Sequence, residues 1–436
     1  MSRIVRFVKW IGKNPKKSIF FGGVLSYGFN WMHQKYQIAN VMRDYCTEAK
    51  KYGEMKAPIN AKLKKVLIIL NPAANKRNAE DDFNEFVAPI LNMAGYFIDI
   101  VKTESDLHAI RLLGEEINEQ YDAFIIAGGD GTISESLTGL LRRNDEISAN
   151  CIIGVIPLGL NNQFSYMFLN SDTNVRNKVE AVKAKAEAAL AIVKGKTQKQ
   201  DVIKIELVSD DEEVAKKVFY GVGSVFWGSF HDILRKKDKY WLTGSLRNYT
   251  ACLFNGVFPR DGVNWNCEAK MIYSAPCSGC SNCYEKPESK SQKLHNSRWW
   301  SKFNSSKEVV PEYSKVLNPH CLETTEIDIN TSEFAITTNC QEGIVNETPK
   351  LTIKIGDKPN NYGPSYIWES WKRVYNKKFL DLPNSTNLQS RQVLLIPKED
   401  NSEEKKENFF SIDHNLFEVR PIKVTLLPKK VDFFVS

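Results

Sequence analysis

The sequence predicts an α/β domain followed by a β-rich domain, and two observations carry this prediction. Between residues 64 and 193, short apolar runs alternate with segments whose apolar residues recur at helical spacing, which is the pattern of strands and helices around a parallel sheet. From about residue 200, the runs alternate with polar residues or are rich in β-branched and aromatic residues, as expected of an antiparallel sheet. We therefore expect an N-terminal Rossmann-like parallel-sheet domain over 60–198 and a C-terminal antiparallel β-sandwich domain over 199–436.

Four strands are predicted in the first domain. Residues 66–70 form a continuous apolar run, typical of a strand buried on both faces. Polar or glycine-bearing loops follow this strand and two later ones, and loops at the carboxyl ends of parallel strands meet at one edge of the sheet. These loops can therefore converge on one ligand. The other predicted strands are 96–101, 124–127 and 152–156, and the predicted helices are 81–93, 107–117 and 175–193.

Gly128-Gly129-Asp130-Gly131-Thr132 is the loop between the third predicted strand and a predicted helix. Glycine lets the backbone turn sharply and approach a ligand closely, and the start of the next helix adds partial positive charge suited to phosphate. A tight turn without a ligand is the alternative for this motif taken alone. The partner loops, Asn71-Pro72 and Pro157-Leu158-Gly159, favour a phosphate site.

The second domain begins with the alternating run at 202–208. A helical excursion is predicted over 239–258, within a domain that is otherwise made of strands. Residues from about 277 to 312 and from 401 to 408 are polar or charged and predict loops. The remaining predicted strands are 217–226, 326–338, 351–355, 393–396 and 422–434.

Residues 1–43 form a basic arm. The arm contains eight Lys and Arg residues and no Asp or Glu, and the whole chain has a net charge of +7, so the remaining chain is nearly neutral at −1. This balance disfavours a nucleic-acid-binding body, which would need a basic face of its own. The apolar run at 18–32 is shorter than the roughly 20 residues of a membrane span. The arm is typical of mitochondrial targeting and membrane anchoring, and the alternatives are a secretory signal peptide and a surface helix.

Nine cysteines are too few for a disulfide scaffold in a chain of 436 residues. Cys277, Cys280 and Cys283 nevertheless form a run with the two-residue spacing of zinc or redox sites. The run lies in a Ser-, Asn- and Lys-rich region without a second such pair, so we favour an exposed insert without a metal over a zinc site. Candidates for a fourth zinc ligand are Cys267, His295, His320 and Cys321.

Together, these motifs resemble a known group of enzymes. Asn71-Pro72, the glycine motif with Glu135, and Pro157-Leu158-Gly159 with Asn162 resemble the nucleotide-binding motifs shared by diacylglycerol, sphingosine and ceramide kinases, in the same order and spacing. Within that superfamily, the chain is most similar to the acylglycerol kinases, which are mitochondrial multi-substrate lipid kinases. The longer stretches that carry this likeness are 69–74, 127–132, 189–195, 227–232 and 424–434.

The resemblance implies a lipid kinase that uses ATP and Mg²⁺. Its substrates would be monoacylglycerol and diacylglycerol, with ceramide as a further one, and its products lysophosphatidic and phosphatidic acid. It would act at the inner mitochondrial membrane, facing the intermembrane space. The resemblance also implies an alternative that needs no catalysis, a structural subunit of the inner-membrane carrier translocase.

Two aspartates are the catalytic candidates that the resemblance implies. An Asp at the position of Asp130 lies by the nucleotide phosphates and the acceptor hydroxyl in the related kinases, where a carboxylate can act as general base or organise the phosphates and metal; capping the following helix is a compatible structural role. Asp413 matches the first residue of an Asp-Gly-Glu triplet near the C-terminus and would order Mg²⁺ through water. His414 and Asn415 depart from that triplet, and a solvated turn is the alternative for Asp413.

The remaining site residues are also carried over from the resemblance. Asp232 belongs to the lipid-site segment, and Ile233-Leu234 stands where sphingosine kinases carry a further Asp, which favours a neutral head group. The aromatic residues near Trp227 can line an acyl pocket or belong to the core. The expected lipid-binding residues are Trp227 and Asp232, and the expected nucleotide-binding residues are Asn71, Pro72, Gly128, Gly129, Gly131, Thr132, Glu135, Gly159, Asn162 and Arg247.

An NAD kinase is a further alternative, because those enzymes share the Gly-Gly-Asp-Gly-Thr loop. The Pro157-Leu158-Gly159 motif, the Trp227 segment and the membrane-directed arm argue against it.

Overall fold

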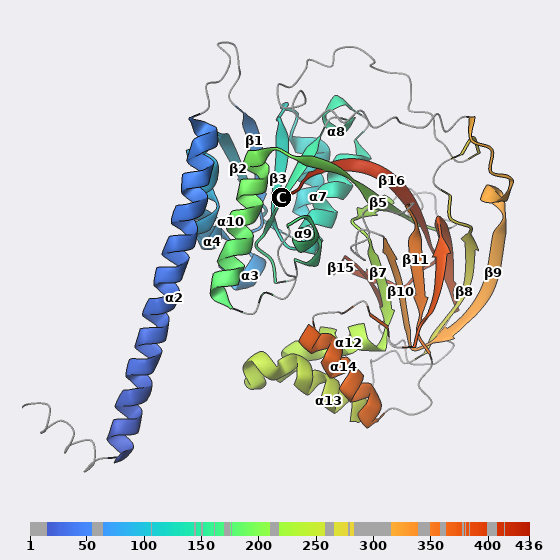
Figure 1. Ribbon diagram of the computed structural model, residues 1–436. Helices are drawn as coiled ribbons and strands as arrows, with labels where there is room; N and C mark the ends of the chain where they lie inside the picture. The colour runs from blue at the N-terminus through green and yellow to red at the C-terminus, as the bar shows by residue number, and fades with distance from the viewer. Residues whose placement is uncertain are drawn as a thin grey trace, which may run out of the picture.

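The computed structural model (Figure 1) consists of a helix-covered parallel sheet that continues into a β-rich half. The described residues are 15–54, 64–105, 107–143, 145–149, 151–160, 162–169, 175, 177–209, 218–257, 266–277, 280–282, 315–338, 349–357, 363–376, 379, 381–382, 384–398, 408–413 and 415–436.

Four parallel strands form the first half of the larger sheet. They are β1 (Lys65–Leu70), β2 (Phe97–Lys102), β3 (Ala123–Gly128) and β4 (Ile152–Pro157), in the order β2-β1-β3-β4. Val66 pairs with Ala123, and Phe124 pairs with Ile153. β3 and β4 are buried along their whole length, as their apolar runs predict.

Helices cover both faces of this parallel sheet, because alternate residues of β1 point to opposite sides. Val66, Ile68 and Leu70 pack in one core cluster with α4, α5 and α10, and Leu67 and Ile69 pack in a second cluster with α6 and α7. The helices are α3 (Ala74–Arg77), α4 (Ala79–Phe86), α5 (Ala88–Met93), α6 (His108–Arg111), α7 (Asp130–Arg142), α8 (Glu146–Ala149), α9 (Gln163–Phe168) and α10 (Lys178–Lys194), with a π-helical turn, η1, at Leu112–Glu116.

Two of the predicted helices are interrupted. The helix expected at 81–93 is two helices that meet at Val87, since a proline occupies the first turn of α5 and cannot donate a backbone hydrogen bond to the preceding helix. The helix expected at 107–117 is a short α-helix followed by the π-helical turn.

The second half contains the rest of the larger sheet and a separate six-stranded antiparallel sheet. The larger sheet continues from β4 in the order β16-β13-β8-β9, with β5 paired to β16 and β6 paired to β5, and the smaller sheet has the order β12-β11-β10-β7-β14-β15. The prediction of an α/β plus β fold is therefore confirmed. The strands are β5 (Thr197–Leu207), β6 (Val218–Gly221), β7 (Ser224–Gly228), β8 (Cys267–Ser274), β9 (Thr324–Thr331), β10 (Glu333–Thr338), β11 (Leu351–Ile355), β12 (Thr386–Ser390), β13 (Gln392–Pro397), β14 (Phe409–Ile412), β15 (Asn415–Glu418) and β16 (Ile422–Phe434).

The long strand β16 joins the two halves. Its end runs parallel to β4, with Asp432 paired to Ile152, and most of its length is antiparallel to β5, with Val424 paired to Ile205. The C-terminal strand thus completes the N-terminal sheet, and the larger sheet is continuous across the expected domain boundary at 198/199. Apolar side chains of this sheet and the smaller sheet face each other in one core cluster, as in a β-sandwich.

A helical group packs on the smaller sheet at the bottom of Figure 1. It comprises α12 (Ser229–Arg235), the 3₁₀ segment η2 (Lys236–Leu246), α13 (Arg247–Val257) and α14 (Pro364–Asn376). The prediction of a helical excursion over 239–258 corresponds to η2 and α13. A buried ion pair ties α14 to β10: Arg373 Nη1 lies 2.6 Å from Glu333 Oε2, both side chains are 6% exposed, and the guanidinium lies over the Phe230 ring.

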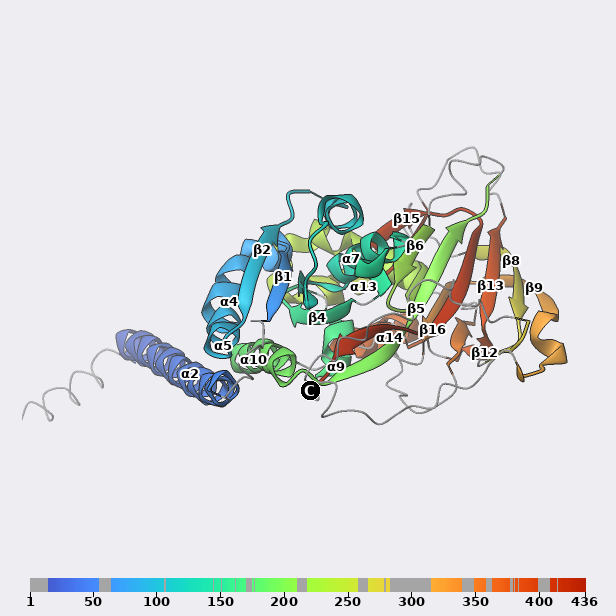
Figure 2. The same cartoon turned by 90° about the horizontal axis from the view of Figure 1, so that it is seen from above.

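The basic arm contains a long helix, α2 (Pro15–Gly53). Its C-terminal part lies beside α10 in Figures 1 and 2, where Lys194 Nζ lies 3.0 Å from Glu48 Oε1. Its N-terminal part extends away from the body and exposes large apolar side chains, including Phe20, Phe29 and Trp31. Among the described helices, none combines the length and the apolar character that crossing a membrane requires. Residues 1–14 of the arm lie outside the described residues.

The first prediction concerns the ion pair between α14 and β10. Arg373→Met should lower the free energy of unfolding by about 3–5 kcal/mol, because it leaves the Glu333 carboxylate buried without its cation. Denaturant unfolding measures the change. The matched control is Arg420→Met, since the Arg420–Glu418 pair has the same 2.6 Å separation but is at least half exposed and should contribute less than about 1 kcal/mol. Equal effects of the two substitutions would contradict the prediction.

Candidate active site

Three loops meet at the carboxyl ends of β1, β3 and β4. Asn71 Nδ2 donates a hydrogen bond to Thr132 Oγ1 at 3.0 Å, which joins the loop after β1 to the start of α7. The N–H groups of Leu158 and Gly159 both donate to the Gly128 carbonyl at 3.1 Å, which joins the loops after β4 and β3. The structure therefore brings Asn71, Gly128, Thr132 and Gly159 together, as the order of strands β1-β3-β4 requires.

The glycines of these loops are needed for close packing. Gly128, Gly129, Gly131 and Gly159 are not among the residues with positive φ, so a left-handed turn does not explain them. A Cβ at Gly159 would clash with the Cα of Gly129, and a Cβ at Gly131 would lie 2.6 Å from Asn415 Oδ1. The glycines therefore do not serve a left-handed turn, contrary to the expectation of a sharp turn. They allow the loop after β4 and the start of β15 to approach the glycine motif closely.

Asn162 completes the loop after β4. Its Oδ1 accepts a hydrogen bond from the Gly159 N–H at 2.9 Å, and its Nδ2 donates to the Gly159 carbonyl at 2.7 Å. The side chain is buried, so these bonds hold the loop in one conformation. Pro72 and Glu135 are half-buried and lie on the loop after β1 and on α7 respectively.

The loop after β1 continues into a backbone that ordinary residues rarely adopt. Asn75, Lys76 and Arg77 have φ values of 49°, 56° and 69°. Left-handed conformations cost roughly 1–2 kcal/mol for each residue with a Cβ, and such residues cluster at functional sites. This segment directly follows the Asn71-Pro72 motif.

Asp130 is the buried carboxylate of the glycine motif. Its side chain, 4% exposed, accepts hydrogen bonds from the backbone N–H groups of Gln163 and Phe164 at 3.0 and 3.2 Å, which are the first amides of α9. Burial, and next the charge of Asp413, raise the pKa of Asp130 to about 8, although the two amides lower it. Asp130 begins α7 and also caps α9.

Asp413 lies between β14 and β15, and its carboxylate faces the turn between β6 and β7. Its carboxylate accepts hydrogen bonds from the Val222 N–H at 2.7 Å, the Ser224 N–H at 2.9 Å and the Ser224 hydroxyl at 3.0 Å. Burial raises the pKa of Asp413 to about 6 against these donors. The side chain is 1% exposed, so the alternative of a solvated turn residue is wrong.

The residue that departs from the lipid-kinase triplet touches the glycine motif. Asn415, at the start of β15, donates through Nδ2 to the Gly131 carbonyl at 3.4 Å. The Asn415 side chain, a neutral amide where the triplet has Glu, thus contacts Gly131, the residue after Asp130. His414 lies outside the described residues.

Strand β6 anchors the helix that follows the glycine motif. The Tyr220 carbonyl accepts hydrogen bonds from the Ser134 and Thr138 hydroxyls, each at 3.0 Å, and the Tyr220 N–H donates to Thr138 Oγ1 at 2.9 Å. The second half of the chain therefore positions α7 and holds Asp413. Most residues missing from the predicted site act through backbone groups, which leave no signal in side-chain identity; these are Gln163, Phe164, Val222 and Tyr220. Ser134, Thr138 and Ser224 are also missing, and they contribute hydroxyl groups.

Arg247 takes part in a different interaction. It begins α13, and its Nη1 lies 2.9 Å from Asp238 Oδ1 on η2. No described hydrogen bond or ion pair links Arg247 to the three loops, so its role toward phosphate stays a prediction.

The two expected lipid-binding residues are buried in the second half. Trp227 is 2% exposed, donates through Nε1 to Asn408 Oδ1 at 2.8 Å and packs edge-on against Phe410, so its surroundings are those of a core residue. Asp232, in α12, is 1% exposed. Contact of either residue with lipid stays a prediction.

A pocket of about 390 Å³ opens between α4 and α10, beside the strained segment at Asn75. Its charged wall is an ion pair in which Lys185 Nζ lies 2.6 Å from Asp82 Oδ2. None of the expected site residues lines this pocket, so the candidate site is defined by Asp130, Asp413 and the three loops. The lining residues are Asn75, Asn78, Asp81, Asp82, Phe86, Lys178, Ala181, Val182 and Lys185.

The raised pKa values predict how stability depends on pH. Asp130 and Asp413 have folded-state pKa values of about 8 and about 6, above the value of 3.8 for a free aspartate. The folded state therefore binds their protons more tightly than the unfolded state, and their stabilising effect is full below about pH 4 and is lost as the pH rises to about 8.

Asp130→Asn should reduce this loss. Thermal unfolding at pH 5 and pH 8 should show a smaller difference in Tm for the variant than for the parent chain, because one of the two titrating groups is gone. Asp81→Asn, on the exposed face of α4, is the control and should keep the parent difference. An unchanged difference in Asp130→Asn would contradict the assignment of a buried, titrating carboxylate.

The chain is similar to known proteins over nearly its whole length. Residues 65–205 match the model of the diacylglycerol kinase catalytic domain, and residues 222–436 match the model of the acylglycerol kinase C-terminal region. Human mitochondrial acylglycerol kinase is 33% identical over 440 residues, which cover 98% of this chain and 96% of that protein. The Xenopus laevis mitochondrial acylglycerol kinase is 31% identical over 449 residues, which cover 99% and 95%.

A solved structure shares the fold. A Bacillus anthracis protein provisionally named a diacylglycerol kinase superposes with a TM-score of 0.50 and 16% identity over 86% of this chain and 99% of that one. At this identity the likeness concerns the fold alone. The two family models and the full-length similarity identify the chain as a lipid kinase, and it belongs to the acylglycerol kinase family.

Proposed function

We propose that the protein transfers a phosphoryl group from ATP, with Mg²⁺, to the free hydroxyl of monoacylglycerol and diacylglycerol, with ceramide as a further acceptor. The products are lysophosphatidic and phosphatidic acid. The observation that carries this proposal is Asp130, a buried carboxylate with a raised pKa at the meeting point of three loops. Relatives along the full length are named acylglycerol kinases.

The chain's own groups supply the positioning that phosphoryl transfer needs. Because Gly129 and Gly159 have no side chains, their backbones approach each other closely where the loops after β3 and β4 meet. The N-terminus of α7, a helix of 13 residues, contributes partial positive charge beside phosphate. Asp130 lies at that terminus, where its carboxylate can accept the proton of the lipid hydroxyl.

Mg²⁺ fits the carboxylates of this site. Asp130 and Asp413 raise the energy of each other's charged form, as the effect of Asp413 on the pKa of Asp130 indicates, and a divalent cation beside them would offset that repulsion. Asp130 would help to hold the metal and the phosphates. Asp413, whose oxygens already accept three hydrogen bonds, would act through water. When bound, the metal neutralises charge on the phosphates.

The acceptor is expected to have a neutral head group. Asp232 is followed by Ile233-Leu234, so the acid that would pair with an ammonium group is missing from this segment. The exposed aromatic residues of α2 suit contact with a lipid surface. The inner mitochondrial membrane, on its intermembrane-space side, is the proposed location, and the relatives are named mitochondrial.

A subunit of the inner-membrane carrier translocase is compatible with catalysis in the same polypeptide. No contact in the described part of the chain points to that role. An Asp130→Asn variant that still supports carrier import would separate the two roles.

The proposed function predicts loss of lipid phosphorylation in Asp130→Asn. With labelled ATP and mixed acylglycerols in vesicles, kcat/KM should fall by roughly 10²–10⁴-fold, the usual contribution of a general base. Asp201→Asn is the matched control. Asp201 is also a buried aspartate that accepts a backbone hydrogen bond, from the Lys429 N–H, but it lies on β5 and not in the three loops, so the variant should keep parent activity. Retained turnover in Asp130→Asn, or transfer to NAD instead of lipid, would refute the proposal.

The pH dependence of the rate is a second prediction. Since the deprotonated carboxylate is the active form of a base, kcat/KM should rise with pH up to the pKa of Asp130 and level off above it. Burial raises that pKa to about 8 without metal, and Mg²⁺ bound beside the carboxylate should lower it, so the plateau should begin below pH 8 at saturating Mg²⁺. Initial rates between pH 5 and pH 9 measure this, and a rate that falls as the pH rises from 5 to 8 would exclude Asp130 as the titrating base.

A further inference from the structure

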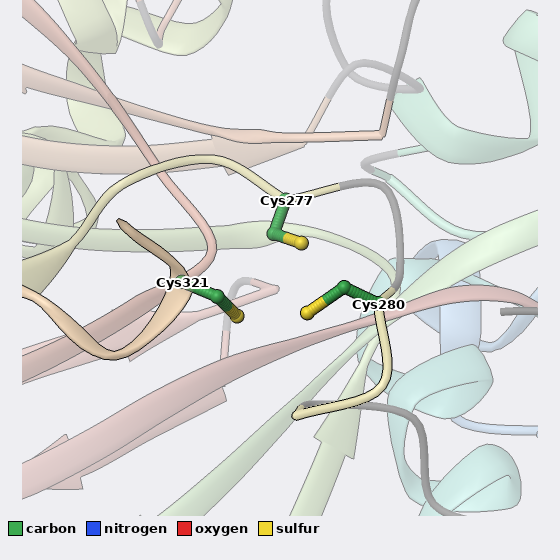
Figure 3. Close-up of side chains that lie close together, drawn as sticks. All are labelled: Cys277, Cys280 and Cys321. Atoms are coloured by element: carbon green, nitrogen blue, oxygen red, sulfur yellow. The ribbon is translucent and has the colours of Figure 1, made fainter. Parts of the chain in front are cut away.

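We propose that Cys277, Cys280 and Cys321 form a structural zinc site. Figure 3 shows their three side chains pointing toward one another from two separate segments of the chain. Cys277 and Cys280 follow β8, and Cys321 lies on η5 (Pro319–Leu322), shortly before β9. The proposal is independent of lipid phosphorylation.

The geometry of the sulfurs is close to that of a zinc site. All three Sγ atoms lie within 4.8 Å of one another. Tetrahedral zinc with bonds of about 2.3 Å to sulfur requires separations of roughly 3.8 Å. Small rotations of the cysteine side chains therefore suffice to bring three sulfurs onto one ion.

The cluster is buried but is too small to be an apolar core. The exposed fractions of Cys277, Cys280 and Cys321 are 6%, 0% and 5%, and among the described residues these three form a cluster separate from the core between the two sheets. Burial of three small side chains removes little apolar surface from water, so it contributes little to the stability of the segments that carry the cysteines. Small units that cannot build a core are commonly held by a metal, whose binding contributes directly to folding.

Hydrogen-bond donors surround two of the sulfurs. Asn318 Nδ2 donates to Cys277 Sγ at 3.4 Å, and Arg391 Nη1 lies 3.9 Å from Cys321 Sγ. Hydrogen bonds and positive charge around ligand sulfurs are typical of metal sites.

Backbone contacts hold the two segments in place. The Ser281 N–H donates to the Val316 carbonyl at 2.8 Å, and the Cys321 N–H donates to the Asn318 carbonyl at 3.3 Å. The bound metal would cross-link the two ends of the long connection between β8 and β9, from residue 275 to residue 323. Such a cross-link stabilises the folded chain because it lowers the entropy of the unfolded chain.

The arrangement favours a structural metal over a redox pair. A reactive Cys-x-x-Cys motif keeps one sulfur exposed, whereas all three sulfurs here are buried, and a disulfide would use only two of them. β9 lies at the opposite end of the larger sheet from β2, beyond β16, β13 and β8, so the cluster is remote from Asp130. The burial of Cys277 and Cys280 contradicts the expectation of exposed cysteines. Cys321 is one of the four residues considered above as a further ligand, and Cys283 lies outside the described residues.

Metal analysis of the full-length chain tests the proposal. Protein purified without chelator from zinc-supplemented cells should contain about one zinc ion per chain. Cys277→Ser, Cys280→Ser and Cys321→Ser should each lose that zinc and unfold at a lower temperature. Cys46→Ser, a half-buried cysteine on α2, is the matched control and should keep both the zinc and the parent Tm.

A second measurement needs no variant and so covers the case in which a substitution prevents folding. Titration of the parent chain with a mercurial should release zinc in step with the modification of buried thiols, and Co²⁺ in place of zinc should give a thiolate charge-transfer band. A zinc-free parent chain, zinc retained in all three variants, iron in place of zinc, or a disulfide between two of the three cysteines in non-reducing peptide mapping would each overturn the proposal.

Discussion

The arrangement of the site depends on two carboxylates, Asp130 and Asp413, that are buried near each other. A buried carboxylate is tolerated only where hydrogen-bond donors surround it, and both receive theirs mainly from backbone amides. The donors to Asp130 belong to the first turn of α9, and those to Asp413 belong to the turn between β6 and β7. Each half of the chain thus surrounds its own carboxylate with donors, and the effect of Asp413 on the pKa of Asp130 indicates that the two carboxylates meet where the halves adjoin.

The C-terminal strand reinforces that junction. Because β16 pairs with β4 at one end and with β5 along most of its length, the parallel sheet and the β-rich half share one hydrogen-bonded framework. The Asn415–Gly131 contact and the bonds from Tyr220 to α7 cross the same boundary. A site built across this framework is pre-organised, and burial raises the pKa of both carboxylates, as is common at functional sites.

Different parts of the chain are stabilised in different ways. Apolar packing holds the two helix layers and the core between the sheets, a buried ion pair fastens the helical group to the smaller sheet, and we assign a metal to the three cysteines, where apolar packing is insufficient. The long helix α2 is different again, since only its C-terminal part packs on the body and its exposed aromatic residues remain available to a lipid surface.

Local sequence determined the strands of the parallel sheet, several strands of the second half, the α/β plus β class and the loop that carries Asp130, because these follow from apolar periodicity and turn residues. It did not indicate β8, β12, β14, β15 or α14. It did not determine the break at Val87 or the π-helical turn, which depend on hydrogen bonding inside each helix. Only the tertiary structure placed β16 beside β4, Asp413 among its donors, Trp227 in the core and Cys321 beside Cys277. Each of these is a contact between residues far apart in the chain, and such contacts depend on strand order and packing, which no local pattern of residues encodes.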